Sequence, residues 1–230
     1  MSIKKIVPYR QRIRLRNLRN APKVRGKQKI FCIGRNKTGT TSLKKAFQQL
    51  GYIVGHQREA ERLHHKHYFA GRFDKFVRYC RYAQVFQDVP FSWPETYKVM
   101  DQAFPGSKFI LTVRDSPEQW YNSITRFHGK LWGKDGAVPT ADDLKNATYI
   151  FKGAPYNVVK LHGTSDDDPY HRETLINHYK AYNQEIIEYF KDRPEDLLVL
   201  NLTEPDAYQK FIDFLGIESD YTAFPWENKT

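Results

Sequence analysis

Short apolar runs alternate with amphipathic stretches along most of this chain. Runs typical of buried strands lie at residues 30–33, 84–87, 108–113 and 197–202, with a shorter one at 52–55. Apolar residues at helical spacing predict helices at residues 41–50, 58–83 with a break near Gly71, 94–104, 117–127, 171–190 and 205–215. This alternation predicts an α/β fold of three layers, with a central, mostly parallel sheet and helices on both faces.

The pattern weakens between Gly129 and Pro169, where glycine, proline and the acidic triplet Asp166 to Asp168 interrupt it. We interpret this segment as an insertion or lid, because long loops in compact domains are often functional.

Charge divides the chain into two parts. Residues 1–29 contain eleven Lys or Arg and no acid, which leaves 26 basic and 26 acidic residues in the remainder and accounts for the whole net charge of +11. We therefore predict a basic N-terminal arm at residues 1–28 and a single domain at 29–230. The arm could contact an acidic polymer or an anionic membrane surface, or be a solvated tail. No RNA-binding aromatic motif accompanies it, so no specific nucleic-acid partner is expected.

The remaining composition is that of a folded domain, with 40% hydrophobic residues among 230. The two cysteines, Cys32 and Cys80, fall in a predicted strand and a predicted helix and suggest no disulfide framework. No apolar run reaches the length of a membrane span or forms a signal-peptide core. We expect a cytoplasmic protein, with peripheral membrane association left open by the arm.

The loop GRNKTGTTSL, Gly34 to Leu43, lies between the first predicted strand and a helix. Such a turn directs successive backbone N–H groups at one point, and the helix dipole adds attraction for an anion. An ATP-binding P-loop carries its lysine directly after the second glycine. Here Thr40 occupies that place, and the lysine of the loop, Lys37, precedes Gly39 by two residues.

The string KTGTTSL resembles the 5′-phosphosulfate loop of sulfotransferases that use 3′-phosphoadenosine 5′-phosphosulfate (PAPS) as sulfate donor. The resemblance implies that Lys37 contacts the oxygen that bridges phosphate and sulfate. It also implies that the 5′-phosphate is surrounded by Thr38, Gly39, Thr40, Thr41 and Ser42.

A second segment, Phe109 to Ser123, places Arg114 at the end of a strand and Ser123 on the next predicted helix. Ligands of open α/β sheets bind at this edge, and the planar guanidinium suits a phosphate. The segment resembles the 3′-phosphate element of sulfotransferases, although its spacing is nine residues rather than about eight. The closing segment, Ala223 to Thr230, resembles that of bacterial sulfotransferases, which implies a 3′-phosphate contact for Lys229 unless the terminus is frayed.

Sulfuryl transfer requires a base for the acceptor hydroxyl and a cation for the leaving phosphate. Lys37 is the candidate cation. Asp88 ends the third predicted strand, where cytosolic relatives carry a catalytic histidine, and is our first candidate base. His56 is our second candidate base. It lies after the second predicted strand, near Glu59 and Glu61, where glycan-acting relatives carry a glutamate. Asp88 and His56 could act as a pair, or each could be structural.

The resemblance implies a hydroxylated acceptor, and we favour a carbohydrate. Aromatic residues near the motifs could stack on a sugar or belong to the core: Trp93, Tyr97, Trp120, Tyr121 and Trp132. No metal is expected, because His64, His65 and His67 have no cysteine nearby and sulfuryl transfer needs none.

Two other functions compete with this interpretation. One is a P-loop kinase with Asp88 as a magnesium ligand, which the missing lysine after Gly39 disfavours. The other is a non-catalytic module that binds acidic polymers through its arm and keeps the nucleotide fold as a scaffold.

Overall fold

The computed structural model describes residues 8–225. It contains the strands β1 (Ile30–Cys32), β2 (Val85–Gln87), β3 (Lys108–Val113) and β4 (Leu197–Asn201). Its α-helices are α1 (Tyr9–Val24), α2 (Thr40–Gln49), α3 (Gln57–His67), α4 (Asp74–Tyr79), α5 (Thr96–Ala103), α6 (Pro117–Trp132), α7 (Ala141–Asn146), α8 (Asn157–His162), α9 (Arg172–Tyr189) and α10 (Ala207–Leu215). No helix within 8–225 is both long and apolar enough to cross a membrane.

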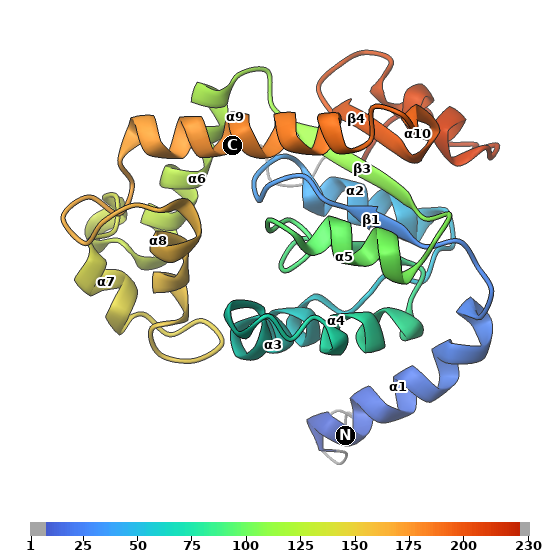
Figure 1. Cartoon of the computed structure of the whole chain (residues 1–230), viewed down its shortest axis with the longest axis horizontal. Helices are drawn as coiled ribbons and strands as arrows, with labels where there is room; N and C mark the ends of the chain where they lie inside the picture. The colour runs from blue at the N-terminus through green and yellow to red at the C-terminus, as the bar shows by residue number, and fades with distance from the viewer. Residues whose placement is uncertain (1–7, 226–230) are drawn as a thin grey trace.

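The strands form one sheet in the order β2-β1-β3-β4, and all of its pairings are parallel (Figure 1). This arrangement confirms the predicted α/β fold. The predicted strand at 52–55 contributes only a single parallel bridge, between Val54 and Val85. Because β1 lies between β2 and β3, the loops that follow these three strands meet at one edge.

Alternation along the strands produces a core on each face of the sheet. Phe31 of β1 points to the face covered by α3, α4, α5 and α9, where the rings of Phe86, Phe91, Phe104 and Phe109 lie within 6.0 Å of its own, centroid to centroid. Its neighbours Ile30 and Cys32 point to the other face, which α2 and α10 cover. The three predicted layers follow from this alternation.

The segment predicted as an insertion or lid contains two short helices, α7 and α8. Leu144 of α7 and Val159 of α8 pack with Trp120 of α6 and Tyr179 of α9 in a third hydrophobic cluster. The cluster lies beyond the sheet, at the end of α6 and α9 (Figure 1). The helices were not predicted because six residues are too few to show helical periodicity, and packing rather than local preference stabilises them.

Residues 9–24 of the basic arm form the helix α1. It packs against the 3₁₀ turn Cys80–Tyr82, and Val24 is buried at its end. This part of the arm is therefore ordered and packs locally.

Replacing Phe31 with alanine should destabilise the protein strongly, because the cavity would open among the stacked rings at the centre of the sheet. We expect a loss of about 3–5 kcal/mol in the free energy of unfolding, measured by urea denaturation. Val199→Ala, on β4 with a side chain 42% exposed, is the matched control and should cost less than about 1 kcal/mol. Equal losses would contradict this assignment of the core.

Candidate active site

The loop between β1 and α2 passes very close to β3. A Cβ atom on Gly34 would lie 2.0 Å from Thr112 Oγ1, so only glycine fits there. Gly39, at φ 98°, turns the chain into α2, and Lys37 also adopts a positive φ of 73°. Thr38 Oγ1 donates to Arg35 O over 2.6 Å and lies 2.6 Å from Thr112 Oγ1. These contacts fix the loop against the neighbouring strand.

The amino end of α2 follows directly after this turn. Thr40, Thr41 and Ser42 form its first turn, which contains no acidic residue. The N–H groups at the start of a helix and the positive end of its dipole make such a turn attractive to a phosphate.

Arg114 connects the loop to the end of β3. Its Nε donates to the carbonyl oxygen of Lys37 over 2.6 Å, and its backbone N–H donates to Tyr179 Oη over 3.0 Å. Within residues 8–225, the two terminal guanidinium nitrogens carry no hydrogen bond or ion pair, so they can receive an anion. Ser123 is buried on α6, and its Oγ has no hydrogen-bond partner in the same part of the chain. The structure thus brings Arg114 to Lys37, because β1 and β3 are neighbours in the sheet.

The Lys37 ammonium lies over the ring of Phe127, 4.1 Å from its centroid. Burial lowers the pKa of Lys37, and the nearby charge of Arg114 lowers it further, while Asp88 raises it. The neighbouring positive charges of Lys37 and Arg114 favour a ligand that carries several negative charges.

Asp88 lies at the end of β2, beside the same loop. It adopts a positive φ of 63°, and its Oδ1 accepts hydrogen bonds from the side-chain amide of Asn36 and from Val89 N–H. Burial raises the pKa of Asp88 to about 6, against the opposing effect of the Val89 hydrogen bond. A carboxyl group with this pKa is ionised at neutral pH and basic enough to accept a proton.

His56 is exposed and precedes the first residue of α3. Burial and then Arg16 lower the pKa of its imidazole, and Glu59 raises it. The two hydrogen bonds that Asp88 Oδ1 accepts come from Asn36 in the loop and from Val89 N–H, and neither comes from His56. The structure therefore does not join His56 and Asp88 as a pair. Lys229 lies outside the described residues.

A cavity of about 290 Å³ opens beside Asn36 of the loop and beside Phe127, the residue whose ring lies under the Lys37 ammonium. Asp88 and Glu61 supply its carboxylates, and the rest of the wall is largely aromatic: Trp93, Trp120, Phe127, Trp132 and Tyr149. Residues from α8 and from the turn before it close the far side, including Asn157, Leu161 and His162. A larger cavity of about 690 Å³ lies at the opposite edge of the sheet, between the end of α1 and Phe104, far from the phosphate loop.

Three side chains of the cavity were not predicted as functional or were only noted in passing. Arg35 is 2% exposed and donates to Ser92 O over 2.7 Å, while a second terminal nitrogen lies 2.9 Å from His162 Nε2. Burial lowers the pKa of His128 to about 3, which keeps the imidazole neutral. Glu61 is buried and accepts from Tyr149 Oη over 2.7 Å. Arg35 could have been noticed within the loop string, whereas nothing in the sequence connects residues 149–162 to this site.

The aromatic residues noted in the sequence divide between the cavity wall and other contacts, and two of the wall residues, Trp93 and Trp120, are themselves buried in the core. Trp93, Trp120 and Trp132 line the cavity, whereas Tyr97 donates to Glu185 and Tyr121 donates to Tyr170 O. Among residues 8–225, no group of three or more His, Cys, Asp or Glu side chains could hold a metal ion. His64 instead packs its ring on Trp93, 3.8 Å between centroids.

Replacing Asp88 with asparagine should stabilise the fold at neutral pH. The pKa near 6 lies above the value of about 3.9 in an unfolded chain, so ionising Asp88 costs the folded state more. The penalty is present above pH 6 and disappears as the pH falls toward 4. Asparagine keeps the shape and tolerates positive φ. Asp88→Asn should therefore raise Tm at pH 7.5 but hardly at pH 4.5.

Asp101→Asn is the control, because its effect on Tm at neutral pH should be opposite to that of Asp88→Asn. Burial would raise the pKa of Asp101, but hydrogen bonds from Arg193 and Tyr189 outweigh it and lower the pKa. This variant should lower Tm at pH 7.5. A lower Tm for Asp88→Asn at pH 7.5 would contradict the unfavourable burial of its charge.

Comparison with known proteins agrees with this geometry. The family model described as "Sulfotransferase domain" matches residues 29–230. No curated protein matches the chain. The match covers the whole sheet, the phosphate loop, Arg114 and the cavity, and it leaves out α1. The chain belongs to the sulfotransferase domain family.

Proposed function

We propose that this protein transfers a sulfuryl group from PAPS to a hydroxyl group of an acceptor bound in the aromatic cavity. Residues 29–230 would form the catalytic domain and residues 1–28 an arm outside it. The hydrogen bond from Arg114 Nε to the carbonyl oxygen of Lys37 is the observation that carries this proposal. It couples a loop suited to a 5′-phosphate to a guanidinium suited to a 3′-phosphate.

The donor fits the loop after β1 and the end of β3. Thr38 and Gly39, with Thr40, Thr41 and Ser42 of the first turn of α2, would surround the 5′-phosphate, chiefly through backbone N–H groups at the positive end of the helix dipole. The terminal nitrogens of Arg114 and the buried Oγ of Ser123, which lacks a partner within 8–225, would receive the 3′-phosphate. Lys229 remains a further candidate for this contact. PAPS supplies the activated sulfate, and no metal is required.

Lys37 would stabilise the charge that develops on the leaving phosphate. Its ammonium contacts a ring face rather than a carboxylate, so it can turn to an anion without breaking an ion pair described within 8–225. Burial near Arg114 strengthens its interaction with negative charge.

Asp88 is the base that the geometry favours. It lines the cavity, it is close enough to Lys37 to raise that group's pKa, and Asn36 orients its carboxylate. In one in-line step the acceptor hydroxyl would give its proton to Asp88 as its oxygen bonds to sulfur, and the S–O bond to the donor phosphate would break. His56 stays a weaker candidate, because it is exposed and does not line this cavity.

The cavity wall supports an acceptor that presents a ring to stacking side chains. Phe127, Trp132 and Tyr149 are the exposed or partly exposed aromatic residues of this wall, and the neutral His128 and Glu61 add hydrogen-bonding groups. A carbohydrate of one or two rings meets both requirements, and we retain it as the proposed acceptor.

A kinase is the second candidate, and the position after Gly39 disfavours it. Thr40 stands there and is 7% exposed at the start of α2, so no lysine follows the second glycine toward a β- or γ-phosphate. A non-catalytic module would have no use for the groups that we propose to bind the 5′-phosphate and the 3′-phosphate.

Thermal shift distinguishes these functions. At a hundredfold excess over Kd, adenosine 3′,5′-bisphosphate should raise Tm by about 5–10 °C, and ATP with magnesium should do so far less. Arg114→Gln should abolish the shift, whereas Arg126→Gln, an exposed arginine on the same helix as Ser123, should preserve it. Stabilisation by ATP alone would indicate the kinase, and by neither nucleotide the binding module.

Turnover assigns the catalytic groups. Lys37→Ala should lower kcat about 10²–10³-fold, and Asp88→Asn about 10²–10⁴-fold, in a labelled sulfate transfer assay across glycans, lipids and phenols. In the wild type, kcat/KM should fall as the pH drops below about 6, the pKa of Asp88. Near-normal turnover of Asp88→Asn would remove it from this role, and His56→Ala and Glu61→Gln would then test the remaining candidates.

A further inference from the structure

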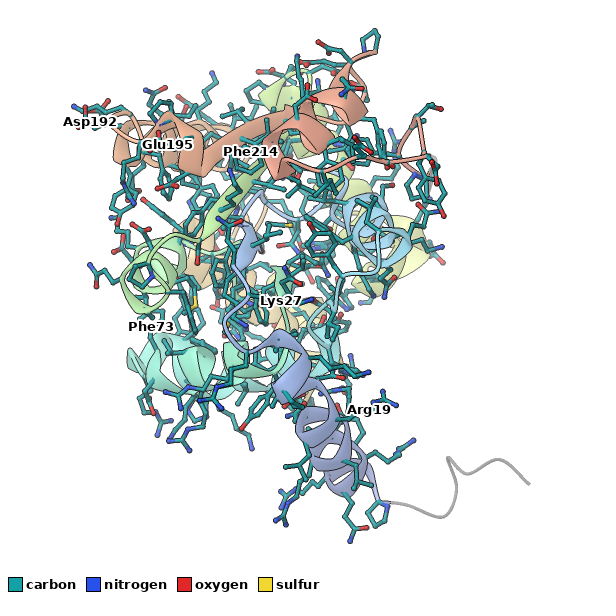
Figure 2. The ribbon with its side chains drawn as sticks, turned by 90° about the vertical axis from the view of Figure 1, so that its right-hand side faces the viewer. Arg19, Lys27, Phe73, Asp192, Glu195 and Phe214 are labelled. Carbon is teal, nitrogen blue, oxygen red and sulfur yellow. The ribbon has the colours of Figure 1, made fainter. Side chains whose placement is uncertain are left out.

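The helix α1 carries a dense set of cations on its free side. Arg10, Arg12, Arg14, Arg19 and Lys23 are all exposed, and no acidic residue occurs in the helix. Figure 2 shows α1 projecting from the body, with Arg19 along it and Lys27 where the chain enters the domain. The basic surface continues into the groove at the base of the helix, which Arg25, Lys27 and Arg81 line.

Two leucines lie in the middle of this charged surface. Leu15 and Leu18 are 61% and 63% exposed, more than any other large hydrophobic side chain in residues 8–225. At 100° per residue, they share one stripe with Gln11 and Pro22. Arg12, Arg19 and Lys23 follow one side of the stripe, and Arg10 and Arg14 follow the other. An apolar stripe between two cationic rows is typical of helices that lie in a membrane interface.

The opposite side of α1 fixes its orientation on the domain. Arg16 forms an ion pair with Glu59, and the Arg62 guanidinium lies 4.2 Å from the centroid of the Tyr9 ring. Val24 is 1% exposed, and Lys29 Nζ donates to Ala83 O over 2.6 Å just beyond the helix. The leucine stripe is therefore held outward rather than folded onto the core.

We propose that the free face of α1 docks on an anionic lipid bilayer, with the leucines inserted among the headgroups and the flanking arginines on lipid phosphates. Charge complementarity supports an anionic partner, and the exposed leucines favour a bilayer over a nucleic acid or a sulfated polymer. A polyanion in water would contact the arginines but give the leucines no apolar environment. The sulfotransferase match begins at residue 29, so this surface is independent of the proposed catalysis.

Vesicle flotation of the full chain tests the proposal. The protein should float with phosphatidylcholine vesicles containing about 30% phosphatidylserine, but not with phosphatidylcholine alone. Binding should fall at about 0.5 M NaCl, where exposed charges are screened. Replacing Arg12, Arg14 and Arg19 with glutamine should weaken partitioning about a hundredfold, at about fivefold per charge. Leu15→Ser with Leu18→Ser should weaken it about tenfold or more.

Matched controls lie elsewhere on the surface. Lys134, Lys191 and Lys210 changed to glutamine, and Val138→Ser with Ile187→Ser, remove similar charges and exposed apolar groups away from α1 and should bind like the wild type. Equal binding to both vesicle types, or no vesicle binding, would overturn the proposal. So would heparin or DNA binding that survives the leucine changes while vesicles fail, or a leucine-dependent dimer in light scattering that does not bind lipid.

Discussion

The loop after β1 is held from both sides by residues that end the neighbouring strands. Arg114, after β3, donates to the carbonyl oxygen of Lys37, and Asp88, after β2, accepts from the side chain of Asn36. Trp120 Nε1 adds a bond of 3.0 Å to the carbonyl oxygen of Asn36. These bonds require β1 to lie between β2 and β3, so sheet order and site geometry form one constraint. A loop fixed in this way can direct its N–H groups at an anion without reorganising when the anion binds.

The burial of two charged groups near this loop carries an electrostatic cost. Asp88 and Arg35 are both charged groups in a largely apolar environment, and burial shifts the pKa of each toward its neutral form. Arg35 has carbonyl, imidazole and aromatic partners instead of a carboxylate, and its guanidinium lies 5.1 Å from the centroid of the Tyr182 ring. Buried charge is kept in a fold at such a cost mainly where it meets a ligand. Both groups line the cavity, so their shifted pKa values support it as the candidate site.

The sequence predicted what depends on local pattern. Apolar runs predicted the four strands, and the glycine and lysine positions of the loop indicated the tight turn of a candidate phosphate site, because backbone turns need particular residues at particular places. The strand predicted at 52–55 was wrong, because only a single bridge from Val54 to Val85 forms there. Long-range contacts could not be predicted. Arg35 to His162 joins residues 127 positions apart, and Tyr149 reaches Glu61 across 88. Helix α1 was missed because alternating arginines suggest a solvated tail.

The proposed donor and acceptor sites come from different parts of the chain. Strand ends and α2, which the sheet fixes, would bind the donor. The wall that faces the acceptor comes partly from residues 149–162, whose packing on α6 and α9 is separate from the two sheet cores. Trp120 belongs to both parts, because its indole N–H holds the loop while its ring stacks on Tyr179 at 4.6 Å between centroids. Changes in the insertion can therefore alter the shape offered to an acceptor while the loop, Lys37 and Arg114 keep their positions. Changes at Trp120 would affect both proposed sites, and so would changes at Arg35, because its side chain reaches from the loop to His162 of α8.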